Sequence, residues 1–356
     1  MAEQKNTPIL KHMKSAVNKV SLKKVESTEL DYSNEKILIV KNLKKYFPMG
    51  KGFFKKPTQF VRAVDDVSFS IERGKTLGIV GESGCGKTTL GRTILRLTSI
   101  TDGSVYFNGI DISTLSRKQL RKLRPKIQII FQDPYSSLSP RMTVGEIIGE
   151  AVRAHKIVLK DQYKDYIIKV MKSCGLQPHY FDRYPHEFSG GQRQRICIAR
   201  ALALKPDLII CDEPVSALDV SIQAQILNLL KDLQRKLGLT YIFISHDLSV
   251  VEHISDDVAV MYLGSIVESG RKEKIFNNPQ HPYTKALLSA VPVPDPKIKM
   301  KRIILGGDIP SPVNPPAGCK FHTRCKECMT PCTSIAPKFK EYEEGHKVAC
   351  HLYPQD

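Results

Sequence analysis

The sequence predicts an α/β fold whose core is a parallel sheet that carries a phosphate-binding loop. Three observations support this prediction. Residues 81–88 read G-x-x-x-x-G-K-T, the apolar run 77–80 before them suits a buried strand, and residues 89–95 after them have the apolar spacing of a helix. A strand, a glycine-rich turn and a helix start, in this order, form the context in which this motif binds phosphate.

The residue types of this loop suit the phosphates of a nucleotide. Backbone N–H groups of a curled loop and the N-terminus of a helix offer hydrogen bonds and positive charge to a triphosphate, and glycines let the backbone approach it closely. Lys87 can reach the β- and γ-phosphates, and the Thr88 hydroxyl can bind Mg²⁺. The predicted nucleotide contacts are Gly81, Glu82, Ser83, Gly84, Cys85, Gly86, Lys87, Thr88 and Thr89.

The N-terminal part of the chain predicts an extension followed by antiparallel strands. Residues 1–35 are polar and weakly patterned, which is typical of a flexible or loosely helical extension. The first strand begins at 37–40, and a segment rich in Gly, Lys and Pro ends near Gln59. Because residues 64–71 alternate between apolar and polar, they predict a strand of an antiparallel β subdomain.

The middle of the chain predicts an inserted helical subdomain. Short strands are expected at 103–109 and 127–131. Residues 140–180 then lack strand character and carry apolar residues at helical spacing. We therefore expect a helical subdomain at about 136–190 within the α/β core.

The next segment returns to the α/β pattern. A long helix is expected through residues 193–204, and strands are expected at 208–211 and 241–244. The helix predicted between these two strands, at about 221–237, completes a βαβ unit.

The amino-acid composition changes near residue 270, where the C-terminal region begins. Prolines punctuate the chain from there onward, and five of the nine cysteines fall within the last 38 residues. We expect the α/β domain to span 36–270 and a Pro/Cys-rich appendage to span 271–356.

Charge and hydropathy limit the class of protein. The net charge of +18 reflects 54 basic and 36 acidic residues, and the segments 41–62 and 112–126 contain seven and six basic residues and no acidic one. This balance favours an anionic partner, or a solvated surface that keeps the protein in solution. No run of 18 apolar residues and no signal-peptide core is visible, so we expect a cytoplasmic protein.

Two carboxylates follow the predicted strand at 208–211. Parallel sheets bind ligands at the carboxyl ends of their strands, so Asp212 is predicted to hold Mg²⁺ and Glu213 to act as the general base that polarises the attacking water. Acids also follow strands as helix caps. Because the same chain carries a phosphate-binding loop, we favour the catalytic interpretation of these two acids over the helix-cap one.

A second anion site is predicted at Ser189–Gln192. Ser189 is a plausible helix N-cap, and the two glycines after it leave backbone N–H groups bare. The loop at 81–88 already has its own helix start. We therefore predict a head-to-tail pair of chains in which each closes the nucleotide site of the other.

On these motifs the chain resembles the ATP-binding cassette ATPases over about residues 37–270. Their signature is LSGGQ-like, and here Phe188 stands in place of its leucine. The resemblance implies ATP as the nucleotide, ATP hydrolysis as the reaction and a phosphate-loop (RecA-like) core. It also implies nucleotide contacts from Ser189, Gly190, Gly191 and Gln192.

The resemblance assigns roles to further residues. Gln132 would sense the γ-phosphate and Mg²⁺, Asp219 would lie in the loop that crosses the dimer interface, and His246 would contact the γ-phosphate and orient water. Tyr46 would stack on adenine, with Phe47 and Phe60 as alternatives. The implied catalytic set is Lys87, Gln132, Glu213 and His246, and the implied Mg²⁺ set is Thr88, Gln132 and Asp212.

Within that family the chain looks most like the F-type ATPase of oligopeptide and dipeptide importers, on residues 81–89, 131–138, 216–225 and 281–284. This implies a sister D-type ATPase, two membrane permeases and an extracytoplasmic peptide-binding protein, with the chain on the cytoplasmic face of the membrane. An importer for nickel or another small solute is an alternative. A soluble cassette protein acting on nucleic acid is disfavoured, because such proteins usually carry two cassettes or a long coiled coil, whereas about 100 residues separate Lys87 from Ser189.

The C-terminal cysteines predict a metal centre. Four soft ligands near one another, Cys319, Cys325, Cys332 and Cys350, suit zinc or an iron–sulfur cluster. The tail from Gly318 resembles the cysteine-bearing region of the same importers, which implies a [4Fe–4S] cluster, with Zn²⁺ as the alternative. Cys328 falls outside this pattern, as a free thiol or a competing ligand. Ordinary thiols or disulfides are the remaining interpretations, although the cytoplasm disfavours disulfides.

Overall fold

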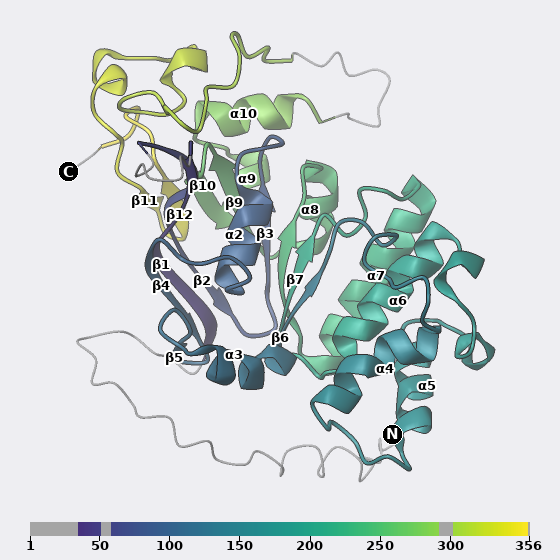
Figure 1. Ribbon diagram of the computed structural model, residues 1–356. Coiled ribbons are helices and arrows are strands. Elements are labelled where there is room, and N and C mark those ends of the chain that lie inside the picture. Colours follow the sequence, from purple (N-terminus) through teal and green to yellow (C-terminus); the bar gives the residue numbers. More distant parts are fainter. Residues whose placement is uncertain (1–34, 51–57, 292–301, 355–356) are drawn as a thin grey trace, which may run out of the picture. The chain divides into compact units, whose positions relative to one another are not determined.

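Two sheets organise the part of the protein that the structure describes. The structure, a computed structural model, describes residues 35–50, 58–291 and 302–354. The predicted N-terminal extension therefore lies outside the described residues, except for Glu35. Figure 1 shows the strands and the helices around them.

The smaller sheet is antiparallel and has the strand order β2-β1-β4-β5. Its first two strands form a long hairpin that pairs from Lys36 with Glu72 to Met49 with Gln59. The predicted antiparallel element is confirmed, but its strands are longer than the apolar pattern indicated because the paired backbones continue through polar residues. The strands are β1 (Lys36–Met49), β2 (Gln59–Glu72), β4 (Asp102–Phe107) and β5 (Ile110–Asp111).

The larger sheet has the order β11-β12-β10-β9-β3-β8-β7-β6. Strands β9, β3, β8, β7 and β6 run parallel to one another, whereas β10, β12 and β11 are added antiparallel beyond β9. Strands β3, β7 and β8 are fully buried, which explains their continuous apolar runs. The bounds are β3 (Thr76–Val80), β6 (Ile127–Ile130), β7 (Leu208–Asp212), β8 (Thr240–Ile244), β9 (Asp257–Tyr262), β10 (Ser265–Arg271), β11 (Lys340–Glu343) and β12 (His346–Val348).

The helices pack around these sheets, and the expected helical subdomain is present. Helix α4 packs against α5 and α6, and buries Ile147, Ile148 and Val152 in the main core. Helix α2 contacts strands of both sheets. Among the described residues, no helix combines the length and the apolar character needed to cross a membrane. The bounds are α2 (Lys87–Ile94), α3 (Arg117–Leu123), α4 (Val144–Ala154), α5 (Tyr163–Ser173), α6 (Gly190–Leu202), α7 (Val220–Leu237), α8 (Leu248–Ile254), α9 (Lys272–Asn277) and α10 (Pro282–Ser289).

Part of the C-terminal region extends the larger sheet. Strand β12 pairs with β10, with Val348 opposite Glu268. The same two strands are joined by side chains, because Glu268 Oε1 lies 2.8 Å from His346 Nε2 and both side chains are completely buried. The predicted appendage is therefore joined to the core sheet through its last two strands.

Candidate nucleotide site

The phosphate-binding loop connects the buried strand β3 to helix α2, as predicted. Glycine is required at two of its positions because the neighbouring backbone is close. A Cβ atom on Gly81 would lie 2.2 Å from the carbonyl oxygen of Met261, and one on Gly86 would lie 2.0 Å from that of Ala63. Gly86 also has a φ of +107°, which L side chains rarely adopt. The loop geometry therefore depends on these two residues.

The ammonium group of Lys87 is held by the loop itself. Its Nζ donates to the carbonyl oxygens of Gly81, at 2.7 Å, and Glu82, at 3.0 Å. The side chain is buried, with 5% exposure. A buried cation held by carbonyl oxygens is well suited to meet an anion.

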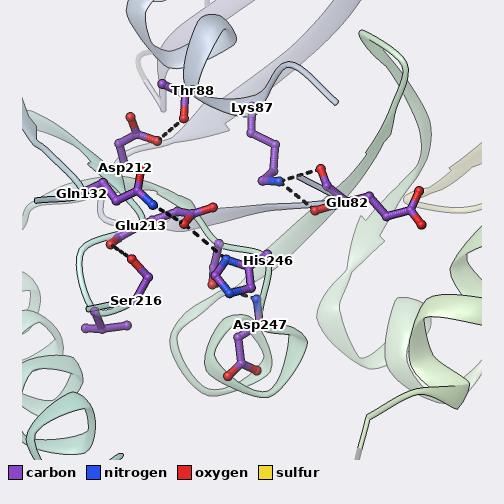
Figure 2. A network of polar contacts seen from close by, with 12 residues as sticks. Glu82, Lys87, Thr88, Gln132, Asp212, Glu213, Ser216, His246 and Asp247 are labelled. Carbon is purple, nitrogen blue, oxygen red and sulfur yellow. Dashed lines mark hydrogen bonds and ion pairs between the residues drawn. The ribbon is translucent and has the colours of Figure 1, made fainter. Parts of the chain in front are cut away.

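Asp212, at the end of β7, meets the first turn of α2. Thr88 Oγ1 donates a 2.7 Å hydrogen bond to Asp212 Oδ1, and Figure 2 shows this pair beside Lys87. The aspartate is 2% exposed, and burial is the main cause that raises the pKa of its carboxyl. A hydroxyl and a buried carboxylate are oxygen ligands of the kind that Mg²⁺ prefers.

Glu213 receives two side chains from other parts of the chain. Its Oε2 accepts a 2.9 Å hydrogen bond from Gln132 Nε2 and lies 3.2 Å from His246 Nδ1 (Figure 2). The backbone N–H of Glu213 donates to the carbonyl of Ile244, which ties the ends of β7 and β8 together. Its φ of +48° places the side chain in an uncommon backbone conformation. Three residues predicted as catalytic thus converge at one carboxylate.

A cavity of about 580 Å³ lies over this loop. Its walls include six predicted residues of the loop and α2, from Ser83 to Thr88, together with Thr89, Gln132, Glu213 and His246. Other lining residues were not among those predicted from the sequence: Val61, Arg62, Ala63, Leu263, Gly264 and Pro312. Leu263 and Gly264 form the β9–β10 turn, and Pro312 arrives from the C-terminal region. Short turns and a single proline carried no motif that could have identified them.

The three aromatic residues predicted as candidates for stacking on adenine differ in their position relative to the cavity. Phe47 lines the cavity, whereas Tyr46 and Phe60 are not among its lining residues. The Tyr46 hydroxyl donates a hydrogen bond to Asp65, and Arg62 lies 5.8 Å from the centre of the Tyr46 ring. Phe60 is exposed. The cavity therefore favours Phe47 as the aromatic surface beside the nucleotide.

The Ser189–Gln192 segment begins α6, as predicted, but does not line this cavity. Ser189 is the N-cap, with its Oγ 3.4 Å from Gln192 N, and Gln192 Oε1 accepts from Ser189 N at 3.1 Å. Asp219, the N-cap of α7, also lies outside the cavity lining. The structure of one chain does not bring these residues to its own phosphate-binding loop.

The C-terminal cysteines lie near one another. Burial, and then the negative charge of Cys332, Cys350 and Cys325, raises the pKa of the Cys319 thiol to about 11. Burial likewise raises the pKa of Cys350 to about 11. Cys328 is exposed. Among the described residues, no three His, Cys, Asp or Glu side chains are arranged to hold a single metal ion.

Comparison with known sequences decides the family. Residues 64–216 match the family described as ABC transporter, and residues 267–332 match the oligopeptide/dipeptide transporter C-terminal region. The oligopeptide transport ATP-binding protein AppF of Bacillus subtilis is 55% identical over 324 residues, which are 90% of this chain and 98% of that protein. The chain belongs to the ABC transporter family. The dipeptide transport ATP-binding protein DppF of Escherichia coli is 52% identical over 330 residues, or 93% of this chain and 98% of that protein.

Solved structures of ABC transporter proteins share the fold. The protein cbiO1 from Clostridium perfringens, described as part of the ABC transporter complex cbiONQ, gives a TM-score of 0.60 at 30% identity, covering 68% of this chain and 92% of that one. A dimeric post-hydrolysis state of the ATP-binding cassette MJ0796, bound to ADP and Pi, gives 0.59 at 28% identity, covering 66% and 98%. These similarities confirm the α/β cassette core and the ATPase class predicted from the motifs.

Proposed function

We propose that this chain binds and hydrolyses ATP to drive the import of oligopeptides or dipeptides through a membrane transporter. The observation that supports the hydrolysis is the convergence of Gln132 and His246 on Glu213, with all three residues lining the cavity. The cargo is inferred from the matched C-terminal family and from the names of the relatives.

The phosphates of ATP would occupy the loop side of the cavity. Backbone N–H groups of the loop residues that line the cavity, from Ser83 onward, and the N-terminus of α2 would hold the phosphate oxygens. Lys87 would exchange its carbonyl partners for the β- and γ-phosphates. Phe47 would pack against the base at the other end, as an alternative to the predicted Tyr46. Binding and charge stabilisation account for most of the catalysis expected in phosphoryl transfer.

Thr88 and Asp212 would hold Mg²⁺, with Gln132 as a further ligand. The buried Asp212 carboxylate accepts a hydrogen bond from Thr88, and its raised pKa indicates that a nearby positive charge would stabilise its ionised form. When bound, the ion would neutralise phosphate charge and orient the γ-phosphate. Glu213 would accept a proton from the attacking water, and His246 would position that water and contact the γ-phosphate.

Closure of the site would need a second chain. Ser189, Gly190, Gly191 and Gln192 form an open helix N-terminus that lies outside this chain's cavity, and Asp219 stands at the start of another helix. We infer that they contact the nucleotide of a sister ATPase, of D type, in a head-to-tail pair. Two permeases and an extracytoplasmic peptide-binding protein would complete the importer, with this chain at the cytoplasmic face of the membrane.

The test of this function is peptide uptake together with ATPase activity. Cells that lack the natural chain would be supplied with the wild type, Lys87→Ala, or the exposed control Lys118→Ala. Uptake of labelled di- and oligopeptides should stop with Lys87→Ala and continue with the control. Normal ATPase activity without peptide uptake in the wild type would show that the cargo is a different solute.

We also propose that Cys319, Cys325, Cys332 and Cys350 hold a [4Fe–4S] cluster. The raised pKa values of Cys319 and Cys350 reflect burial first and then the neighbouring cysteines, but among the described residues the thiols do not converge on one ion. A cluster spans more space than zinc, because each thiolate binds a different iron. When bound, it would cross-link the C-terminal segment and offer one-electron chemistry.

Metal content tests the cluster. Protein purified without oxygen should contain about four irons and four sulfides and lose them in Cys325→Ser, while Cys328→Ser should keep them. Stoichiometric zinc, or neither metal, would contradict the proposal and leave the ATPase assignment standing.

A further inference from the structure

One residue of the phosphate-binding loop is held from outside the ATPase core. Both oxygens of Glu82 accept hydrogen bonds from Arg324, with Nη1 to Oε2 at 2.8 Å and Nη2 to Oε1 at 3.1 Å. The backbone N–H of Glu82 donates to the Tyr283 hydroxyl at 2.9 Å. Two residues that lie far along the chain therefore fix the outer side of this loop.

The same residue contacts the functional lysine. The carbonyl oxygen of Glu82 accepts the 3.0 Å hydrogen bond from Lys87 Nζ (Figure 2). The position of Glu82 thus sets one of the two carbonyl oxygens that hold the ammonium group. A shift of Glu82 would move the backbone that surrounds the phosphates.

The Arg324 contact has the features of a strong ion pair. It is bidentate, and the side chain of Arg324 is only 8% exposed, against 25% for Glu82. Bidentate guanidinium–carboxylate pairs are both stronger and more directional than single contacts. Exposed surface pairs, by contrast, contribute little. This pair can therefore hold the loop in one geometry.

Aromatic side chains pack around the turn that carries Arg324. It ends the short turn His322–Arg324, and Phe321, which precedes that turn, is buried against the rings of Tyr262 and Tyr283, with ring centres 5.2 and 5.4 Å away. The guanidinium lies 6.0 Å from the Tyr262 ring centre. These packed aromatic rings thus support the Arg324 guanidinium where it contacts the loop.

A second cation of the same segment, Lys320, also contacts residues around the site. Lys320 Nζ donates to Asp65 Oδ2 at 2.8 Å, to Ser265 Oγ at 2.7 Å and to the carbonyl of the cavity-lining Leu263 at 3.0 Å. Further upstream, the Pro312 carbonyl accepts from Arg62 N at 3.0 Å, and both residues line the cavity. Residues 312–324 therefore contact the site at three places.

We propose that Arg324 is a positioning residue for ATP binding, which acts through Glu82 to hold the phosphate-binding loop in its binding geometry. The proposal rests on the proposed ATP site. It makes the cysteine-bearing segment a part of nucleotide recognition, and predicts that ATP and ADP affinity depend on a contact between residues 242 positions apart in the sequence.

The test is a double-mutant cycle on nucleotide affinity. Binding of a fluorescent ATP analogue, with competition by ATP and ADP, would be measured for the wild type, Arg324→Gln, Glu82→Gln and the double variant. Each single change should weaken binding of both nucleotides about tenfold, as expected for a lost charge-assisted pair. The double variant should bind no more weakly than either single variant, because both changes remove the same pair. Arg324→Lys should recover part of the loss.

Lys326→Gln is the matched control, since it removes an exposed cation from the same segment and should leave affinity unchanged. In steady-state assays, Arg324→Gln should raise KM for ATP and leave kcat within about twofold. Wild-type affinity in Arg324→Gln, or fully additive effects in the double variant, would overturn the proposal. If Arg324→Gln does not fold, Glu82→Gln decides alone, and wild-type affinity there has the same meaning. A wild-type chain that binds no ATP would instead refute the proposed function.

Discussion

Thr88 and Asp212 lie 124 positions apart in the sequence, and the Thr88 hydroxyl donates a 2.7 Å hydrogen bond to Asp212 Oδ1. The contact joins the first turn of α2 to the end of β7. Both residues come from separate motifs, so the fold itself brings together the two side chains proposed to hold Mg²⁺.

Removing the Thr88 hydroxyl should raise the Mg²⁺ requirement. Thr88→Val keeps the volume of the side chain but loses the oxygen, and we expect the Mg²⁺ concentration for half-maximal ATPase activity to rise about tenfold or more. Thr88→Ser should behave like the wild type. An unchanged Mg²⁺ titration in Thr88→Val would remove Thr88 from the metal site.

Glu213→Gln should stop hydrolysis without preventing ATP binding. The amide cannot accept the proton of the attacking water, so turnover should fall about 100-fold or more, and the ATP-bound pair of chains should accumulate as a closed dimer. Size-exclusion chromatography with ATP and a phosphate-release assay would measure both effects. Glu252→Gln, an exposed glutamate on α8, is the control. Undiminished turnover in Glu213→Gln would exclude Glu213 as the base.

The aromatic contact with the base can be assigned by substitution. Stacking of a base on an aromatic side chain contributes about 1–3 kcal/mol, so Phe47→Ala should weaken ATP affinity by roughly five- to 100-fold. Tyr46→Phe, which removes only the hydrogen bond to Asp65, should change affinity little. Equilibrium binding of a fluorescent nucleotide would compare the two. A larger effect of Tyr46→Ala than of Phe47→Ala would restore Tyr46 as the stacking residue.

Stability should fall as the pH drops below 7, because His281 is buried in its neutral form. Burial lowers the pKa of His281 from 6.5 to about 4, so between these values the unfolded chain binds a proton that the folded chain does not. The free energy of unfolding therefore decreases with falling pH, by about 2 kcal/mol at pH 5 relative to pH 7. The lowered pKa of Glu268 acts in the same direction, but only below about pH 4.5.

Urea unfolding at several pH values measures this dependence. His281 Nδ1 accepts a hydrogen bond from Tyr283 N at the start of α10. His281→Asn can keep that acceptor without titrating, so its stability should be flatter between pH 7 and 5. The exposed His186→Asn should retain the wild-type slope. Equal slopes in all three proteins would place the pH dependence elsewhere.

Local patterns in the sequence were enough to predict the elements at the centre of the candidate site. The phosphate-binding loop follows the buried strand β3, and Asp212 and Glu213 stand at the end of the buried strand β7. Such an order is visible in the sequence because it is short. The partners of Glu213, Gln132 and His246, came from the family resemblance, and the structure brings them into contact.

The contacts made by the C-terminal region were not predictable in this way. Lys320 and Arg324 reach Asp65 and Glu82 across 255 and 242 positions, and a charged residue among other charged residues carries no sign of its partner. Strands β11 and β12 have four and three residues, too few to show an alternating pattern. Tertiary pairing, rather than propensity, forms them.

The pairing of β12 with β10 makes the ATPase core inseparable from the C-terminal region. A chain shortened at Arg271 would turn β10 into a bare sheet edge, which invites pairing with other molecules. It would also strip Glu268 of His346 and of the backbone N–H groups of Gln280 and His281, and so leave a charge in the interior without these partners. We therefore expect the shortened protein to aggregate rather than to act as a smaller, active ATPase.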